Sequence, residues 1–256
     1  VFLRCQWHWI STCRNPTSKG DFFSNSSNIS FLQIVDGDMI ATSRPPLIET
    51  LQHKLLHHPL PGPASHSRMA HAVRRVDPVQ DIATTRDAAV LLTLFEKDPG
   101  DWHLIFIRRT SSHQQDKHAG QVGFPGGKRE ESDPDLMYTA LREAEEEIAI
   151  DLSGIDVLGP LSPLYITVSK FLVHPFLAYS WKTPQLMRQE SEVEEILEIP
   201  LASFLQQDSR KETRINLTSG IILNHVPSFQ VNGQVIWGAT AMILSEFLDI
   251  LPVEMP

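Results

Sequence analysis

The sequence is poor in cysteine, has no long apolar run and carries fewer basic than acidic residues, and each shortage excludes a class of protein. Its two cysteines, Cys5 and Cys13, are too few for a disulfide scaffold or a cysteine zinc site. Since no run of about 18 apolar residues occurs, no membrane span is expected. With 22 Lys and Arg against 31 Asp and Glu, the net charge of -9 offers no basic surface, so no nucleic-acid partner is expected.

Residues 1–38 do not read as part of a folded domain. They mix aromatic residues with a run rich in Ser and Asn and show no sustained hydrophobic period. They are also too polar for a signal peptide. Two interpretations remain: a disordered leader, or a non-native extension ahead of a chain that begins at Met39, which we favour. Because targeting and membrane signals are lacking, the expected location is cytoplasmic.

The rest of the chain predicts an N-terminal helix with a linker (39–86) and one α/β domain (87–252). Leu47, Ile48, Leu51 and Leu55 recur at helical spacing over 46–56, and the proline-rich residues 60–67 are expected to be the linker. The histidines of this region lack a ligand pattern with Cys or Glu. We interpret them as solvated or partner-facing rather than metal-binding; they are His53, His57, His58, His66 and His71.

Apolar runs with turn signals predict the strands of the domain. Pro175 inside one of them indicates an edge position or a bulge, and Asn232-Gly233 indicates a hairpin turn. Residues 190–199 are interpreted as an amphipathic helix, residues 201–205 as a short helix and residues 239–251 as a buried closing helix. The expected strands are 88–95, 102–107, 121–124, 157–164, 171–179, 215–223 and 229–237.

The most informative stretch is a glycine loop, Gly126-Gly127, that leads into a helix predicted over 134–149. Ser132 and Asp133 are capping residue types, and Pro134 suits the first helical position. A stripe of apolar residues at helical spacing is expected to pack on a sheet. Its members are Leu136, Ala140, Leu141, Ala144 and Ile148.

Three carboxylates, Glu143, Glu146 and Glu147, share an arc of roughly 100° at the edge of that stripe. Like charges at this spacing repel, and their desolvation is unfavourable, so the arrangement favours a compensating cation. A hard divalent ion, Mg²⁺ or Mn²⁺, suits oxygen ligands. The alternative is a solvated acidic face, as charge runs usually are. The adjacent glycine loop and the Arg142-Glu143 pair favour the metal site.

The segment resembles a Nudix box: Gly, five residues, Glu, seven residues, Arg-Glu-apolar-any-Glu-Glu-any-Gly-apolar. Gly127, Arg142-Glu143-Ala144 and residues 146–150 match it. The sequence departs from the pattern at Asp133, which replaces the first Glu with one extra residue before Arg142, and at Ala149, which replaces the late Gly. The resemblance implies an α/β/α Nudix sandwich, with a mixed sheet between the box helix and a C-terminal helix.

Residues before the box are similar to the extra signature of the coenzyme A diphosphatase branch, as are both departures and the run 237–240. The matching runs are Arg109-Thr110, residues 116–122 and residues 124–127. The branch carries an arginine where this sequence has Gln115 and Asp116. The resemblance implies metal-dependent hydrolysis of coenzyme A or acyl-CoA to adenosine 3′,5′-bisphosphate and (acyl-)4′-phosphopantetheine. The alternatives are a Nudix pyrophosphatase for NADH, ADP-ribose or a dinucleoside polyphosphate, and a non-catalytic nucleotide-binding module.

The expected roles of the residues follow from this resemblance. Glu143, Glu146 and Glu147 are the expected metal ligands and catalytic residues, and Arg142 is expected to orient them. The resemblance implies a further carboxylate from this part of the chain, for which Glu194 and Glu195 are candidates; the alternative, which we favour for either one, is the solvated face of an amphipathic helix. The expected partner is a small nucleotide substrate, and a homodimer stays open. The residues expected to contact the substrate are Arg108, Arg109, Lys117, His118, Gly126 and Gly127. Two alternatives stay open: the arginines cap a sheet edge, and His118 holds its loop by a backbone hydrogen bond.

Overall fold

The computed structural model describes residues 31–35, 38–42, 44–72, 84–110, 120–217 and 220–253, and for 31–35 and 38–42 it describes only the backbone. The chain divides into two compact units, Val1–Arg44 and Pro45–Pro256. In the first unit, β1 (Phe31–Val35) and β2 (Asp38–Thr42) form an antiparallel hairpin. The domain boundary expected after residue 38 therefore falls inside a hairpin, while residues 1–30 lie outside the described residues.

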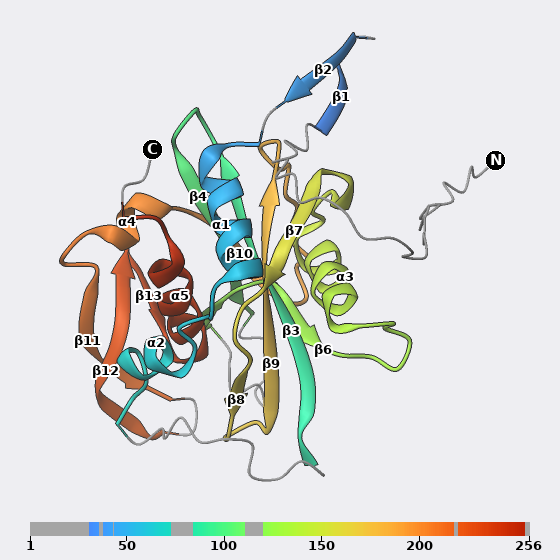
Figure 1. Ribbon diagram of the computed structural model, residues 1–256. Helices are drawn as coiled ribbons and strands as arrows, with labels where there is room; N and C mark the ends of the chain where they lie inside the picture. The colour runs from blue at the N-terminus through green and yellow to red at the C-terminus, as the bar shows by residue number, and fades with distance from the viewer. Residues whose placement is uncertain are drawn as a thin grey trace, which may run out of the picture. The chain divides into compact units, whose positions relative to one another are not determined.

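The second unit is built on one mixed sheet of eight strands (Figure 1). Two central strands, β3 (Arg86–Glu96) and β9 (Phe171–Ser180), run parallel, and the remaining pairs in this sheet are antiparallel. The other members are β4 (Trp102–Arg109) and β10 (Val193–Pro200) beyond β3, β7 (Ile155–Pro160) beyond β9, and the short β5 (Val122–Gly123), β6 (Gly126–Lys128) and β8 (Leu164–Ile166).

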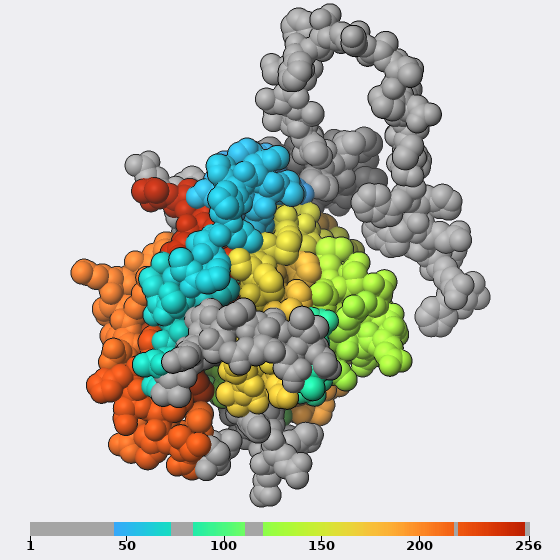
Figure 2. All heavy atoms as spheres, turned by 60° about the horizontal axis from the view of Figure 1, so that its bottom comes forward, coloured from blue at the N-terminus to red at the C-terminus, as the bar shows by residue number. Residues whose placement is uncertain are grey.

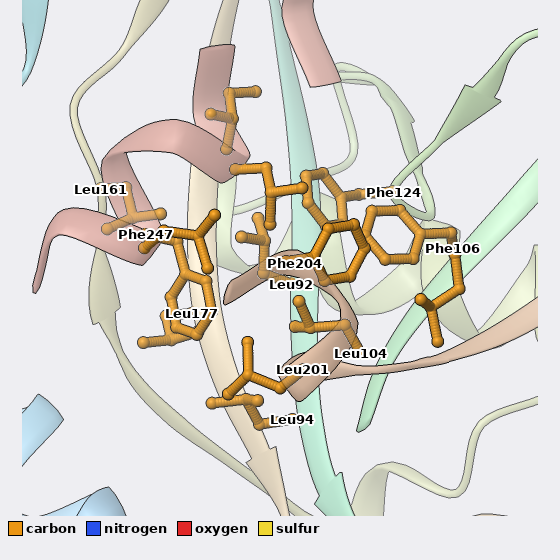
Figure 3. Close-up of a cluster of buried hydrophobic side chains, with 14 of the residues drawn as sticks. Leu92, Leu94, Leu104, Phe106, Phe124, Leu161, Leu177, Leu201, Phe204 and Phe247 are labelled. Atoms are coloured by element: carbon orange, nitrogen blue, oxygen red, sulfur yellow. The ribbon is translucent and has the colours of Figure 1, made fainter. Parts of the chain in front are cut away.

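Helix α3 (Leu136–Ile148) covers one face of this sheet, and α5 (Gly238–Ile250) packs on the other face together with α1 (Pro46–His57) and α4 (Leu201–Leu205). Successive residues of a strand point to opposite faces. Leu91 of β3 accordingly packs with Ala144 of α3, whereas Leu92 joins the core around Phe247 of α5 (Figure 3). The predicted α/β/α sandwich, with a mixed sheet between the box helix and the C-terminal helix, is confirmed. In the part of the chain that the structure describes, no helix combines the length and apolar content needed to cross a membrane.

The box helix begins two residues later than predicted. Asp135 is the N-cap, and its side chain accepts a hydrogen bond from the Tyr138 N–H. Asp133 is no cap, because its carboxylate turns toward Arg142. At the C-terminus, Ala149 has φ 51, the left-handed conformation that glycine favours. The residue that replaces the family's glycine thus keeps the glycine conformation.

Pro175 lies neither at an edge nor in a bulge of its own strand, because β9 is flanked by β3 on one side and by β7 and β8 on the other. The Pro175 carbonyl accepts a hydrogen bond from the Leu161 N–H, in the gap between β7 and β8. Since N and C=O of one strand residue point to the same side, the missing N–H of Pro175 faces that gap. The bulge lies in β7, between Val157 and Gly159.

The prediction of an amphipathic helix over residues 190–199 is wrong, because Val193–Pro200 forms the edge strand β10. A bulge between Val193 and Glu195 shifts its alternation by one residue. Val193 and Leu197 are therefore both buried, at a spacing that imitates a helix. Pairing with β4 decides the conformation, because it satisfies the backbone groups of both strands.

The prediction of a linker over residues 60–67 is also wrong. Pro63–Arg68 forms the short helix α2, which packs against α5. Figure 2 shows α1 (Pro46–His57) and α2, in blue to cyan, against the yellow β7–β8 segment. The predicted α1 stripe is confirmed, since Leu47, Ile48 and Leu51 are buried. Both helices therefore belong to the packed second unit.

His66 of α2 departs from the expectation of solvated histidines. It is buried, and its Nε2 lies 2.9 Å from Glu246 Oε2 of α5. The Gly62 and Ser162 N–H groups also donate to Glu246. Burial raises the pKa of Glu246, but hydrogen bonds from His66 and Ser162 outweigh it, so this pKa lies below its ordinary value. The pair joins α2 to α5, while His53, His57 and His58 are exposed.

A second sheet of three strands, β11 (Arg210–Asn216), β12 (Ile222–Val231) and β13 (Gln234–Trp237), follows the short helix α4 (Leu201–Leu205). The predicted hairpin at Asn232-Gly233 is confirmed, with φ of 50 and 75 as a type I′ turn requires. The strand expected over 215–223 is wrong, because β11 ends at Asn216 and the chain turns before β12.

Candidate active site

The glycine loop brings three chain segments closer together than any side chain would allow. Gly126 pairs with Val90 of β3 at φ +152, and a Cβ there would lie 2.3 Å from the Ala89 carbonyl oxygen. A Cβ on Gly127 would lie 2.4 Å from the Glu143 carboxylate. The two glycines are therefore needed where β6, β3 and α3 meet.

The three glutamates of α3 differ in burial across their arc. The exposed fraction of the side chain is 2% for Glu147, 15% for Glu143 and 60% for Glu146. The helix thus turns Glu147 into the sheet and leaves Glu146 in solvent. The half-buried arrangement expected from helical spacing holds for Glu143, which lies between them.

Glu147 is held by a backbone amide and faces a guanidinium. The Gly126 N–H donates to its Oε2 at 2.8 Å, and Arg109 Nη1 lies 3.4 Å from its Oε1. Burial raises the pKa of Glu147 to about 7 against the opposing effects of Gly126 and Arg109. The charges of Glu143 and Glu192 raise this pKa as well.

The pKa of Glu143 is raised for the same reasons as that of Glu147. Burial raises its pKa, and the charges of Glu146 and Glu192 act in the same direction. Arg142 opposes the shift, with its Nη2 3.0 Å from Glu143 Oε1. Two neighbouring buried carboxylates therefore both favour protonation or a cation.

Arg142 joins three carboxylates. Its Nε and Nη2 each lie 3.0 Å from the Asp133 carboxylate oxygens, which is a bidentate pair, and its Nη1 lies 3.1 Å from Glu146. The hydrogen bond from Arg142 holds the pKa of Asp133 well below its usual range. Asp133 also accepts hydrogen bonds from Thr139 and Glu130 N–H. Asp133 thus fixes Arg142 beside Glu143 and Glu146.

The two arginines at the end of β4 point to opposite faces of the sheet. Arg109 faces Glu147, whereas Arg108 donates to Glu195 and to Gln234. Of the residues expected to contact substrate, the structure therefore brings Arg109, Gly126 and Gly127 to the carboxylates and places Arg108 elsewhere. Lys117 and His118 lie outside the described residues.

A carboxylate that sequence reasoning did not single out, Glu192, lies near this site. The Thr110 N–H donates to the Glu192 carbonyl at 2.9 Å, next to Arg109, and the Glu192 charge acts on both Glu143 and Glu147. Of the two expected candidates, Glu195 faces Arg108, whereas Glu194 is exposed, as Glu192 itself is. Recognising 190–199 as a strand that pairs with β4 would have placed Glu192 beside Arg109.

The donor chemistry of this site fits a hard divalent cation. The available ligands are carboxylate oxygens, the type that Mg²⁺ and Mn²⁺ prefer, and burial makes two of them unfavourable as isolated anions. Within the described ranges, no group of three or more His, Cys, Asp or Glu side chains is arranged to hold a metal ion. Glu146 is exposed and contacts Arg142.

The raised pKa of Glu147 predicts a pH dependence of stability without metal. Unfolded, its carboxyl titrates near the usual 4.5, and folded near 7. Between these values the folded state binds more protons, so the contribution to stability is full below about pH 4.5 and is lost as pH rises through about 7. We expect the unfolding free energy of the wild type, relative to Glu147→Gln, to fall by on the order of 2 kcal/mol between about pH 5 and pH 8.

Urea denaturation of both proteins in a chelator, at these two pH values, measures the difference. The Glu147→Gln variant keeps all the other titratable groups, so the difference between the two proteins reports the titration of Glu147. A difference that stays constant with pH would show that Glu147 is an ordinary carboxylate.

Comparison with known proteins identifies the family. The family model for the NUDIX domain matches residues 84–218. Nudix hydrolase 22, chloroplastic, of Arabidopsis thaliana is 37% identical over 163 residues, which are 62% of this chain and 53% of that protein. The uncharacterized Nudix hydrolase NudL of Yersinia enterocolitica is 37% identical over 163 residues, 63% of this chain and 80% of that protein.

The similarity extends over only part of some relatives and is also seen in solved structures. The matches cover 53% and 55% of the two Arabidopsis relatives, so the chain spans about half the length of these curated relatives. The NUDIX domain of Shewanella oneidensis NrtR, solved with ADP ribose, is 23% identical and covers 51% of this chain and 81% of that one, with a TM-score of 0.39. The NUDIX match over more than half of the sequence, with the NudL relative, shows that this chain belongs to the Nudix family.

Proposed function

We propose that this Nudix hydrolase cleaves the diphosphate bond of coenzyme A or acyl-CoA, giving adenosine 3′,5′-bisphosphate and (acyl-)4′-phosphopantetheine. The observation that carries the hydrolytic chemistry is the pair Glu143 and Glu147, packed against the glycine loop with raised pKa values. Crowded carboxylates out of water favour a cation, and a diphosphate needs one to neutralise its charge.

Nudix hydrolases use divalent metal ions, and the ligands proposed here are Glu143, Glu146 and Glu147. When bound, Mg²⁺ or Mn²⁺ polarises the diphosphate and lowers the pKa of the attacking water. Glu146 is 60% exposed and contacts Arg142, so as a ligand its side chain would turn from Arg142 toward the other two. Arg142 is the proposed positioning residue, because it is anchored on Asp133 and contacts Glu143 and Glu146.

The remaining steps are assigned to residues around this pair. Glu143 or Glu192 accepts the proton of the attacking water, whose oxygen bonds to one phosphorus while the bridging oxygen leaves with the other phosphate. Arg109 donates to a phosphate oxygen from its place beside Glu147. Lys117 and His118 keep their proposed role in contacting the diphosphate.

A contact between two distant runs supports the coenzyme A branch. Residues 120–122 and 237–240 both carry the branch resemblance, and Thr240 Oγ1 donates to the Val122 carbonyl at 3.1 Å. The arginine of the branch, absent at Gln115 and Asp116, keeps NADH, ADP-ribose and dinucleoside polyphosphates as rival substrates. A non-catalytic nucleotide-binding module is the remaining rival.

Product analysis by mass spectrometry tests the proposal. The purified chain is incubated with Mg²⁺ or Mn²⁺ and a panel of coenzyme A, NADH, ADP-ribose and diadenosine polyphosphates. We expect release of 4′-phosphopantetheine from coenzyme A. Cleavage of another member with coenzyme A spared would reject the branch, and no turnover of any member would favour the binding module.

Thermal unfolding with each metal gives a second readout that does not depend on turnover. A ligand of the folded state at about 100 times its Kd adds about 2.7 kcal/mol, which for a chain of this size raises Tm by about 5 °C or more. The shift is expected to disappear in a Glu143→Gln, Glu147→Gln double variant. No shift in the wild type at millimolar metal would contradict the assignment of the ligands.

The proposal keeps the cytoplasmic location and the open choice between monomer and homodimer. Two Arabidopsis relatives carry the words chloroplastic and mitochondrial in their names. An organellar location is therefore the alternative to the cytoplasm.

A further inference from the structure

A cavity of about 460 Å³ lies between the end of β4 and the three-stranded sheet. Its volume is in the range of small-molecule sites, about 300–1,000 Å³. None of the glutamates of the box helix lines it. The lining residues come from β4, β5 and the segment before it, β11, and the β12–β13 hairpin: Arg108, Gly120, Gln121, Val122, Arg214, Ile215, Asn216, Leu217, Gly233, Gln234, Val235 and Trp237.

The charge of this cavity is opposite to that of the protein. The chain carries a net charge of -9, yet the lining contains two arginines, Arg108 and Arg214, and no Asp or Glu. Gln121, Asn216 and Gln234 add neutral hydrogen-bonding groups. Such a lining favours an anion, and guanidinium groups suit phosphate oxygens in particular.

The two arginines differ in the partners that their side chains have among the described residues. Arg108 is oriented by Glu195 and Gln234 through its Nε and Nη2, at 3.3, 3.1 and 2.6 Å, and among the described residues its Nη1 has no partner. Glu195 offsets part of the Arg108 charge, but Arg214 forms no hydrogen bond or ion pair with any described residue. As far as the described residues go, the whole Arg214 guanidinium is open to a ligand.

The rest of the lining suits an organic group beside the anion. Trp237 supplies an aromatic surface, and aliphatic side chains of Val122, Ile215 and Leu217 complete it. Aromatic and aliphatic contacts hold a nucleoside, while a few convergent polar groups fix its orientation. Together with the arginines, these surfaces match a phosphorylated nucleoside.

The cavity lies within a nucleotide's reach of the proposed catalytic carboxylates. Arg108 lines the cavity while its neighbour Arg109, about 3.8 Å away between Cα atoms, faces Glu147. Val122 is four residues from Gly126, which holds Glu147, so these two positions are at most about 14 Å apart. Because Arg108 and Arg109 point to opposite faces of the sheet, a molecule that occupies both places runs around the end of β4.

We propose that this cavity is a subsite for a phosphomonoester on the nucleoside end of the substrate, read by Arg108 and Arg214. The inference rests on the proposed function, because coenzyme A carries such a group, the 3′-phosphate, separated by a ribose from the diphosphate that is cleaved. Arg214 is the specificity-determining residue, and Trp237 supports the nucleoside.

Isothermal titration calorimetry with adenosine 3′,5′-bisphosphate and AMP tests this subsite. We expect the wild type to bind the bisphosphate about tenfold more tightly than AMP, as a lost charge-assisted contact implies. Arg214→Gln is expected to remove most of that difference. Lys211→Gln is the matched control, because Lys211 is an exposed cation on β11 that does not line the cavity. In turnover, the ratio of kcat/KM for coenzyme A to that for dephospho-coenzyme A is expected to fall about tenfold in Arg214→Gln.

Equal affinity of the wild type for both ligands, or a preference that survives in Arg214→Gln, would overturn the subsite. A preference lost equally in Lys211→Gln would indicate long-range charge instead of this cavity and would also overturn it. Since binding is measured apart from turnover, the two proposals are distinguishable. A preference for the bisphosphate without hydrolysis of coenzyme A rejects the proposed function alone, and hydrolysis without the preference rejects the subsite alone.

Discussion

Replacing Glu147 by glutamine is expected to lower kcat/KM for the diphosphate substrate at least about a thousandfold, because a ligand that stabilises transition-state charge contributes several kcal/mol. Glutamine retains the size of the side chain and an oxygen for the Gly126 N–H, so the fold is expected to persist. Glu146→Gln is expected to abolish turnover as well. Steady-state kinetics at saturating metal, with Tm as the measure of folding, checks both variants.

Glu145→Gln is the matched control for these variants. It removes the same charge from the same helix turn, but Glu145 is exposed and points away from the arc of the other glutamates. Its kcat/KM is expected to stay within about twofold of the wild type. Activity retained in both Glu146→Gln and Glu147→Gln would remove the metal assignment.

Gly126→Ala is expected to reduce the free energy of unfolding by about 4 kcal/mol. Part of the loss, about 1–2 kcal/mol, comes from placing a Cβ at φ +152. The larger part comes from overlap, since the Cβ would lie 2.3 Å from the Ala89 carbonyl oxygen and 2.6 Å from Val90 Cα. Both are backbone atoms inside the sheet, which cannot yield without breaking the β3–β6 pairing. Urea denaturation measures the loss.

Gly100→Ala separates the two contributions. Gly100 has φ +83 in the β3–β4 turn, and a Cβ there would meet nothing within 4 Å. Its variant is expected to lose only about 1–2 kcal/mol, the conformational part. If Gly126→Ala were no more destabilising than Gly100→Ala, the close packing of β6 on β3 would not be needed for stability.

Much of the candidate site was predictable because its signals are local. Gly126, Gly127 and the three glutamates lie within one short stretch, and the 3.6-residue period of a helix is enough to place Glu143, Glu146 and Glu147 on one arc. The gradient of burial along that arc was not predictable, because it depends on the sheet that α3 covers. The same holds for the choice of Asp135 over Asp133 as the cap, since Asp133 is drawn to Arg142.

The errors share a cause in long-range pairing. Residues 190–199 imitate a helix because a bulge shifts the alternation of β10, and only pairing with β4 shows the strand. His66 was expected in solvent, and a carboxylate far along the chain, Glu246, keeps it buried. Pro175 was expected at an edge, and an interruption between two neighbouring strands accommodates it inside the sheet.

By itself, the sequence determined the Nudix box, the glycine loop, the box helix with its apolar stripe and the two apolar runs that form β3 and β9, since each depends on neighbours along the chain. Tertiary structure alone decided that the Glu192 charge acts on Glu147, that Arg108 and Arg109 point to opposite faces, and that Arg108 and Arg214 line one cavity. The burial of a side chain and the charges that act on it depend on neighbours within a few ångströms. Which neighbours these are is set by the distant segments that pair and pack together.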